Sequence, residues 1–226
     1  MNRAYNTMRT TATALCAVLL CAVPLHADRF AQDPHDHDFA PLKEAEIAPA
    51  DFTFPAPEAG KTLNLSEAVR GQKLVLLTYF AAWCHNSNFD VQTVKALHDK
   101  YRHKGLAVIG VCEYSSMDEL RDFVRQHKTE YPVCLESDDQ LKDRTVTTHY
   151  KMRMQAGDKD RKWGTPLTLI FRAEALNAAK DANDSATPTV SARVVAGEMN
   201  KSEVEDFIRQ QLSDKKKHAP VQYRER

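Results

Sequence analysis

One cysteine lies where a buried strand is predicted to turn into a helix. Cys84 follows an almost unbroken apolar run at residues 74–80, and residues 88–103 carry apolar side chains at helical spacing. A cysteine at a helix N-terminus meets the positive end of the helix macrodipole and unpaired backbone N–H groups, and both favour the thiolate. The spacing therefore predicts a nucleophilic sulfur at Cys84.

The other four cysteines divide into two pairs by position. Cys16 and Cys21 lie in an apolar N-terminal segment, whereas Cys112 and Cys134 lie in two further predicted strands. We expect a structural disulfide between Cys112 and Cys134, because neighbouring strands would bring them together. Two alternatives stay open: Cys112 is a displaced resolving thiol for Cys84, or Cys112 and Cys134 are buried free thiols.

Strands and helices alternate over the first half of the predicted core. Apolar runs predict buried strands at residues 74–80, 106–112 and 131–135. Helices are predicted between them, one over residues 88–103 and one opened by the capping box Ser116-Met117-Asp118-Glu119. This order predicts βαβ units with right-handed crossovers and parallel strands.

The pattern changes after Pro166. Residues 167–171 and 190–195 read as strands without a long helical crossover, so we expect them to pair antiparallel. Residues 173–188 between them are interpreted as an enlarged loop, and a last helix begins after Asn200. The fold class is therefore α/β, with a central mixed sheet flanked by helices.

The two ends of the chain carry no predicted core. A basic start, an apolar run and a small-residue exit indicate a signal peptide cleaved near Ala27, so we expect an exported, periplasmic or otherwise extracytoplasmic protein without a stable membrane span. Lipidation of Cys16 or Cys21 is disfavoured, because leucine precedes each where a small residue is expected. The predicted division is a signal peptide at 1–27, a flexible linker at 28–48, one domain at 49–213 and a basic, disordered tail at 214–226.

Charge and composition restrict the partners and cofactors. Lys and Arg number 31, as do Asp and Glu, so the formal net charge of +0 does not favour a nucleic-acid partner. The histidines and carboxylates of residues 33–38 could hold a metal ion, but a solvated tail is the preferred interpretation. His149 could bind copper together with Cys84, but a structural histidine is preferred. We therefore expect no metal and no cofactor.

Two short motifs together resemble a known family. Trp83-Cys84 at the strand-to-helix turn, followed later by Gly164-Thr165-Pro166, resembles the thioredoxin-like superfamily over about residues 48–212. The similarity is to its exported branch, which groups TlpA- and ResA-like thiol–disulfide oxidoreductases with AhpC/TSA-type redoxins. The resemblance implies a thioredoxin-like fold, a cis-proline at Pro166 facing the cysteine, and backbone hydrogen bonds from Thr165 to a bound peptide.

The sequence departs from this family at the second active-site cysteine, which is replaced by Ser87. Ser87 cannot resolve a mixed disulfide, but its hydroxyl could donate a hydrogen bond to the Cys84 thiolate. His85 either stabilises the thiolate or turns outward. Glu113 is a candidate proton-transfer group, although a solvated surface carboxylate is the preferred interpretation.

These features predict an exported thiol–disulfide oxidoreductase, or redoxin, with a monothiol mechanism. Its partners would be protein or small-molecule thiols and disulfides, together with an electron donor that the sequence does not identify. One alternative is a peroxiredoxin-like antioxidant peroxidase, but Leu77 and Ala81 replace the proline and threonine that orient peroxide in that family. Another is a non-catalytic module that binds peptides or thiols and kept the fold without turnover.

Overall fold

The computed structural model describes residues 37, 39–138, 141–176 and 189–213. All of them belong to one structural unit that begins at His37. The predicted signal peptide and basic tail lie outside the described residues, as do residues 177–188 of the predicted loop.

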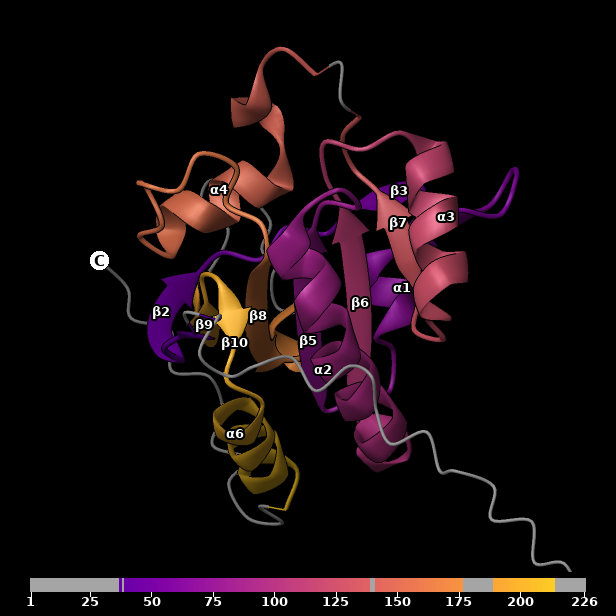
Figure 1. Cartoon of the computed structure of the whole chain (residues 1–226). Coiled ribbons are helices and arrows are strands. Elements are labelled where there is room, and N and C mark those ends of the chain that lie inside the picture. Colours follow the sequence, from indigo (N-terminus) through magenta and orange to yellow (C-terminus); the bar gives the residue numbers. More distant parts are fainter. Residues whose placement is uncertain (1–36, 38, 139–140, 177–188, 214–226) are drawn as a thin grey trace, which may run out of the picture. The chain divides into compact units, whose positions relative to one another are not determined.

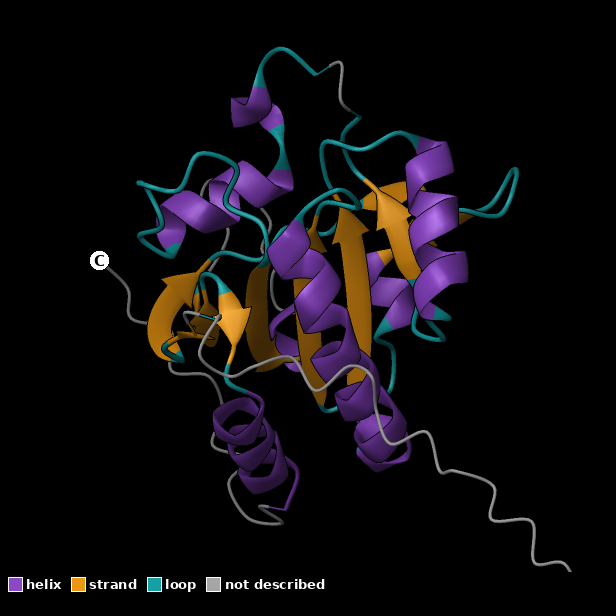
Figure 2. Ribbon diagram, viewed as in Figure 1, coloured by secondary structure: helices purple, strands orange, loops and turns teal. Residues whose placement is uncertain are grey.

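A six-stranded mixed sheet forms the centre of this unit (Figures 1 and 2). Its strands, in spatial order, are β2 (Lys43–Ile47), β9 (Val190–Val195), β8 (Leu167–Arg172), β5 (Leu74–Phe80), β6 (Leu106–Cys112) and β7 (Val133–Leu135). β5, β6 and β7 run parallel, whereas β8 is antiparallel to both β5 and β9, and β2 is antiparallel to β9. The expected mixed sheet is confirmed.

Two small sheets flank the central one. β1 (Phe39–Ala40) pairs parallel with β10 (Glu198–Met199), and β3 (Thr53–Pro55) pairs antiparallel with β4 (Thr62–Asn64). The longer helices are α2 (His85–Tyr101), α3 (Met117–His127), α4 (Thr148–Gln155) and α6 (Lys201–Ser213). The short helices are α1 (Leu65–Ala68) and the 3₁₀ turns η2 (Arg102–Lys104) and η3 (Arg144–Val146).

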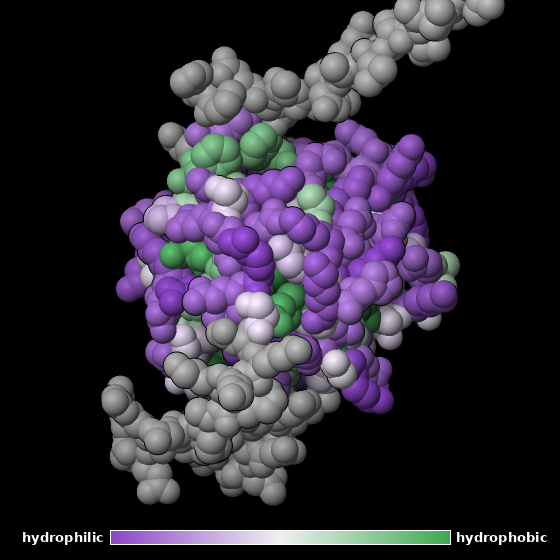
Figure 3. Space-filling model, turned by 90° about the horizontal axis from the view of Figure 1, so that it is seen from below, coloured by the Kyte–Doolittle hydropathy of each residue, from purple (hydrophilic) through white to green (hydrophobic). Residues whose placement is uncertain are grey.

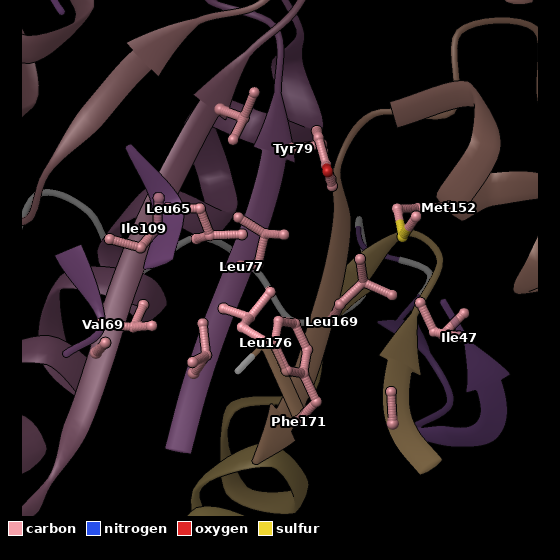
Figure 4. Packing of buried hydrophobic residues seen from close by; sticks show 14 of the residues in the cluster. Ile47, Leu65, Val69, Leu77, Tyr79, Ile109, Met152, Leu169, Phe171 and Leu176 are labelled. Atoms are coloured by element: carbon pink, nitrogen blue, oxygen red, sulfur yellow. The ribbon is translucent and has the colours of Figure 1, made fainter. Parts of the chain in front are cut away.

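Both faces of the sheet are covered. Every residue of β5 is buried, and its side chains alternate between two hydrophobic clusters. Leu76 and Phe80 pack in the cluster that includes residues of α2, α3 and α6. Leu77 and Tyr79 face the opposite side, where α1 and Met152 of α4 pack (Figure 4). The run at residues 74–80 is therefore apolar almost throughout because β5 is buried on both faces.

The face seen in Figure 3 is mostly hydrophilic, with scattered hydrophobic patches. Within the described ranges, no helix combines the length and the apolar character needed to cross a bilayer.

Several predicted elements coincide with the observed ones. β5, β6 and β9 have the predicted limits, and Ser116 and Glu119 form the predicted capping box at the start of α3. Asn200 accepts a hydrogen bond from the backbone N–H of Glu203 at the start of α6 (3.3 Å). α2 begins at His85, three residues earlier than predicted, so Cys84 is its N-cap.

The predicted linker is wrong from residue 39 onward. β2 pairs with β9 along all five of its residues, and Ile47 is fully buried in the core. β2 is an edge strand, and only two of its five side chains, those of Ala45 and Ile47, pack against the core. With so few apolar residues, this segment reads as a polar linker in the sequence. Only its pairing with β9 in the structure identifies it as a strand.

Candidate active site

Cys84 lies in the tight turn between β5 and α2. Its backbone N–H donates to the Ala81 carbonyl (3.0 Å), and its own carbonyl accepts from the Asn88 N–H in the first turn of α2 (3.0 Å). The side chain is partly exposed, and its Sγ donates to the Thr165 carbonyl (3.6 Å). The sulfur therefore points toward the second motif predicted from the sequence.

Asn88 holds this turn, a role that sequence reasoning missed. Its Nδ2 donates to the carbonyls of Ala82 (2.9 Å) and Cys84 (2.8 Å), and its Oδ1 lies 2.7 Å from Nε2 of His127. Because an amide oxygen only accepts, the His127 Nε2 is the donor. The signal available was the spacing of four residues, which places Asn88 one helical turn after Cys84.

The Thr165–Pro166 peptide bond is cis, as the family resemblance implied. Gly164 precedes it with φ +72°, and a Cβ at this position would lie 2.0 Å from Nε of Arg153. The position therefore requires glycine, both for its backbone conformation and for space. The buried loop Gly164-Thr165-Pro166, called the cis-proline loop below, faces the Cys84 sulfur.

A buried ionic cluster holds the cis-proline loop. Arg161 donates to the carbonyls of Pro166 (3.0 Å) and Gly164 (2.9 Å). Asp158 pairs with both Arg161 (2.7 Å) and Arg153 (3.2 Å). Burial alone would raise the pKa of Asp158, but hydrogen bonds and charges from the two arginines outweigh burial and lower it. One carboxylate thus pairs with two guanidinium groups at the loop.

His149 is a structural residue of the same loop. Its Nε2 lies 3.2 Å from the Gly164 carbonyl and must donate to it, so Nδ1 of the neutral ring accepts from the Tyr114 hydroxyl (3.1 Å). Burial, which opposes the charged form, lowers the pKa of His149 to about 3. Both ring nitrogens are engaged, which agrees with the preferred interpretation and disfavours a copper ligand.

The remaining residues near Cys84 have separate partners. Ser87 is buried and accepts a hydrogen bond from the Ala81 N–H (3.4 Å), while its predicted bond to the sulfur stays a prediction. His85 is exposed, and its ring lies parallel to that of His37 at 6.2 Å. Trp83 is 46% exposed, and its indole N–H donates to the Tyr114 carbonyl.

The histidines and carboxylates of residues 33–38 lie outside the described residues except for His37. His37 pairs with Glu198 (2.8 Å) and stacks on Phe89 (3.7 Å between ring centroids). Its side chain is 5% exposed, so the expectation of a solvated tail is wrong at this residue. In the described part of the chain, no three metal-ligating side chains are grouped closely enough to hold an ion.

The expected disulfide between Cys112 and Cys134 is wrong. Their strands are neighbours, but Cys134 is in register with Val111 and Cys112 with Leu135. The two side chains therefore face opposite sides of the sheet, in different hydrophobic clusters, and both thiols are free. A one-residue offset decides this, because side chains alternate between faces along a strand.

Burial also makes Cys112 and Cys134 poor nucleophiles. Burial raises the pKa of Cys112 to about 12 and raises that of Cys134 as well. Both groups are protonated thiols at neutral pH, and the thiolate is the reactive form. This opposes the alternative in which Cys112 resolves a disulfide on Cys84, and it favours two buried free thiols.

Glu113 is not a solvated surface carboxylate. It is fully buried and accepts a hydrogen bond from the Ser137 hydroxyl (2.5 Å). Burial raises its pKa well above the usual range, and the nearby charge of Glu136 adds to the effect. Its sequence position after an apolar strand gave no signal of this burial.

Comparisons with known proteins agree with this architecture. The model of the AhpC/TSA family matches residues 45–175, more than half of the 226-residue chain. No curated protein matches the sequence.

Several solved structures are similar to the chain at low identity. The thioredoxin domain of a thiol-disulfide oxidoreductase from Bacteroides vulgatus is 15% identical, with a TM-score of 0.51 over 76% of this chain and 99% of that one. A secreted thiol-disulfide isomerase from Corynebacterium glutamicum is 17% identical, with a TM-score of 0.50 over 72% and 84%. A thiol:disulfide interchange protein from Bacteroides sp. is 15% identical, with a TM-score of 0.50 over 75% and 90%. These similarities confirm the thioredoxin-like fold.

Proposed function

Because this chain belongs to the AhpC/TSA family and has a thioredoxin-like fold, we propose that it is an exported thiol–disulfide oxidoreductase acting through the single nucleophile Cys84. The observation that carries the proposal is the Cys84 Sγ, partly exposed at the start of α2 and 3.6 Å from the carbonyl that precedes the cis Thr165–Pro166 bond. The similar thiol-disulfide oxidoreductase, isomerase and interchange protein support the activity, and the secreted isomerase among them supports export.

The first step is a thiol–disulfide exchange. The Cys84 thiolate attacks one sulfur of a substrate disulfide, the Cys84–substrate S–S bond forms, and the original S–S bond breaks. The second substrate sulfur leaves as a thiolate and takes a proton from water. An external thiolate then attacks the substrate sulfur of the mixed disulfide, so a substrate–external S–S bond forms and Cys84 leaves as a thiolate. A second external thiol attacks the external sulfur of that bond and releases the reduced substrate, so two external thiols are oxidised to one disulfide.

The resolving sulfur comes from another molecule in this mechanism. Ser87 has no sulfur, and Cys112 and Cys134 are fully buried thiols. The mixed disulfide on Cys84 should therefore persist until a thiol from solution or from a partner protein reaches it.

The peroxidase alternative has less support in the site. Ala81 has no hydroxyl to orient peroxide, and Leu77 lies in the hydrophobic core. We therefore expect stopped-flow mixing of the reduced protein with hydrogen peroxide to show slow sulfenic acid formation at Cys84, without efficient turnover. Rapid peroxide consumption with a thiol reductant would favour the peroxidase.

Trapping of the mixed disulfide tests the proposal directly. The reduced protein is mixed with a single-cysteine peptide activated as a 2-pyridyl disulfide, and intact mass is measured. We expect one peptide adduct on the native protein and on Cys112→Ser, and none on Cys84→Ser. Peptide binding that survives in Cys84→Ser, combined with no adduct on the native protein, would favour the non-catalytic module instead.

Restoring the second cysteine separates the architecture from the chemistry. Ser87→Cys should create insulin-disulfide reductase activity that the native protein lacks, because an internal thiol can then resolve the mixed disulfide. Ser191→Cys, which adds a thiol on the distant strand β9, is the matched control and should stay inactive. No gain in Ser87→Cys would count against a competent substrate groove.

A further inference from the structure

A small aromatic pocket adjoins both halves of the site. Its volume is about 290 Å³, and one wall, Trp83, directly precedes the nucleophile, while another, Trp163, directly precedes the cis-proline loop. The full lining is Trp83, Tyr114, Asp138, Leu141, Arg144 and Trp163, and we call it the Arg144 pocket. The walls are therefore positioned by the same elements that position Cys84 and Thr165.

The aromatic walls support one another. The rings of Trp83 and Trp163 meet edge to face at 5.3 Å, and Tyr114 lies 5.3 Å from Trp163. The Trp83 indole N–H donates to the Tyr114 carbonyl (2.7 Å), which fixes the wall formed by the residue before the nucleophile.

Arg144 brings a cation into this apolar setting. Its guanidinium lies 3.6 Å from the Trp163 ring centroid and 5.1 Å from that of Tyr114. Over the part of the chain that the structure describes, the Arg144 side chain has neither a carboxylate partner nor a hydrogen bond. A guanidinium stacked on an indole keeps its N–H edge available, and that edge matches a carboxylate.

The charge around the pocket favours an anion. Lys162 lies 5.3 Å from the Trp163 ring centroid, and Asp138 supplies one carboxylate to the lining. Arg144 and Lys162 therefore supply two positive charges near the pocket, against one negative charge from Asp138. The volume lies at the lower end for a small-molecule site, so it fits one side chain of a larger substrate.

We propose that the Arg144 pocket binds an acidic side chain of a polypeptide disulfide substrate, close to the cysteine that Cys84 attacks. This inference rests on the proposed function and names its substrate class. The substrate main chain lies along the cis-proline loop, and its carboxylate is paired with Arg144 over the Trp163 ring. An acidic residue beside the substrate cysteine should then speed mixed-disulfide formation.

Matched peptides test this preference. Three peptides activated as 2-pyridyl disulfides carry glutamate, glutamine or phenylalanine next to their cysteine, and release of pyridine-2-thione is followed. We expect the glutamate peptide to react about fivefold faster than the glutamine peptide with the native protein. Arg144→Gln should bring this ratio close to one, and Arg144→Lys should give an intermediate ratio.

Arg209→Gln provides the charge control, because Arg209 is an exposed residue of α6. It should leave the ratio unchanged. A native ratio near one, an equal fall in Arg209→Gln, or a preference for the phenylalanine peptide would each overturn the proposal.

Binding without reaction separates this inference from the proposed function. Trp83 and Trp163 are the two tryptophans of the chain, and both line the pocket, so tryptophan fluorescence reports its occupancy. Titration of Cys84→Ser with the same peptides carrying serine in place of cysteine should show tighter binding of the glutamate form. Equal binding of the glutamate and glutamine forms would overturn the inference even if Cys84 reacts, and selective binding without any adduct would overturn only the proposed reaction.

Discussion

The two loops that form the site are each held by one side chain that donates to two backbone carbonyls. Asn88 donates to Ala82 and Cys84 in the turn before α2. Arg161 donates to Gly164 and Pro166 in the cis-proline loop. The geometry is similar, but Asn88 is neutral, whereas Arg161 carries a charge that the structure must balance.

That difference makes the two loops depend on different physics. The Cys84 turn is continuous with a 17-residue helix, so most of its order comes from helix hydrogen bonds and packing. The cis-proline loop depends on a buried carboxylate, Asp158, shared by Arg153 and Arg161. Replacing Arg161 removes a charged donor from two carbonyls of a buried loop, and hydrogen bonds from charged donors are worth more than those from a neutral amide. The cis-proline loop should therefore be the more fragile half of the site.

The largest effect is expected from a methyl group added to the cis-proline loop. Gly164→Ala would place a Cβ 2.0 Å from the Arg153 guanidinium at φ +72°, so we expect a loss of about 3 to 5 kcal/mol in unfolding free energy. Gly157→Ala is the matched control, since its φ is +75° but no atom lies within 4 Å of the added Cβ, and about 1 kcal/mol should be lost. Urea denaturation measures the unfolding free energy of both variants. Equal losses would show that the Arg153 side chain moves away from the added Cβ at little cost.

Removing the two carbonyl donors compares the loops directly. Arg161→Met removes the charged donor from two carbonyls of the cis-proline loop and one of the two ion pairs of Asp158, so it should cost about 2 to 4 kcal/mol in unfolding free energy. Asn88→Ala should cost about 1 to 2 kcal/mol, because its carbonyl partners lie near the surface at the start of α2. Denaturation at matched pH and salt gives both values. A larger loss for Asn88→Ala would reverse the comparison.

Acid should act on the cis-proline side through His149. Its folded pKa is lowered to about 3 from 6.5, so between these values the unfolded chain binds a proton that the folded protein does not. Stability contributed by the neutral ring is therefore lost as pH falls through this window, by up to about 1.4 kcal/mol per pH unit. His149→Gln should lower the free energy of unfolding at pH 7. Between pH 6.5 and 4, however, the unfolding free energy of this variant should fall less than that of the native protein.

The opposite slope is expected on the Cys84 side, from Asp90 of α2. Burial raises its pKa from 3.8 to about 7, and the nearby charge of Glu198 adds to this effect, although a hydrogen bond from the Met199 N–H opposes it. Between these pH values the folded protein keeps a proton that the unfolded chain releases, so stability falls as pH rises. Asp90→Asn, whose amide oxygen can still accept from Met199, should gain stability relative to the native protein from pH 4 to 8.

Between about pH 4 and 6.5, the contributions of His149 and Asp90 to the pH dependence of stability have opposite signs and nearly cancel in the native protein. The two variants are therefore needed to separate them. Thermal unfolding followed by circular dichroism across this range gives both differences. If stability changed with pH in the same direction in both variants, the opposite pKa shifts assigned to His149 and Asp90 would be contradicted.

Much of the fold is determined by local features of the sequence. The apolar run of β5 predicts a strand buried on both faces, and the Ser116 capping box predicts the start of α3, because each signal lies within a few neighbouring residues. The placement of Cys84 and Pro166 on facing loops follows from the order of strands and helices together with the family resemblance.

The tertiary structure decided the features that depend on register and on distant partners. Cys112 and Cys134 lie on neighbouring strands, but a one-residue offset places them on opposite faces of the sheet. Arg161 and Arg144 read as ordinary charged loop residues, and only folding brings one onto the carbonyls of the cis-proline loop and the other onto the Trp163 ring.

Cys84 illustrates the difference between what local sequence determines and what tertiary packing determines. Its position at a strand-to-helix turn is a local property, so the sequence by itself determined that one exposed thiol would lie at the edge of the sheet. Among the described cysteines, its isolation from a second reactive sulfur is a property of packing, because burial keeps the thiols of Cys112 and Cys134 protonated. Local sequence determines which elements form, whereas the faces and partners of their side chains depend on how those elements pair.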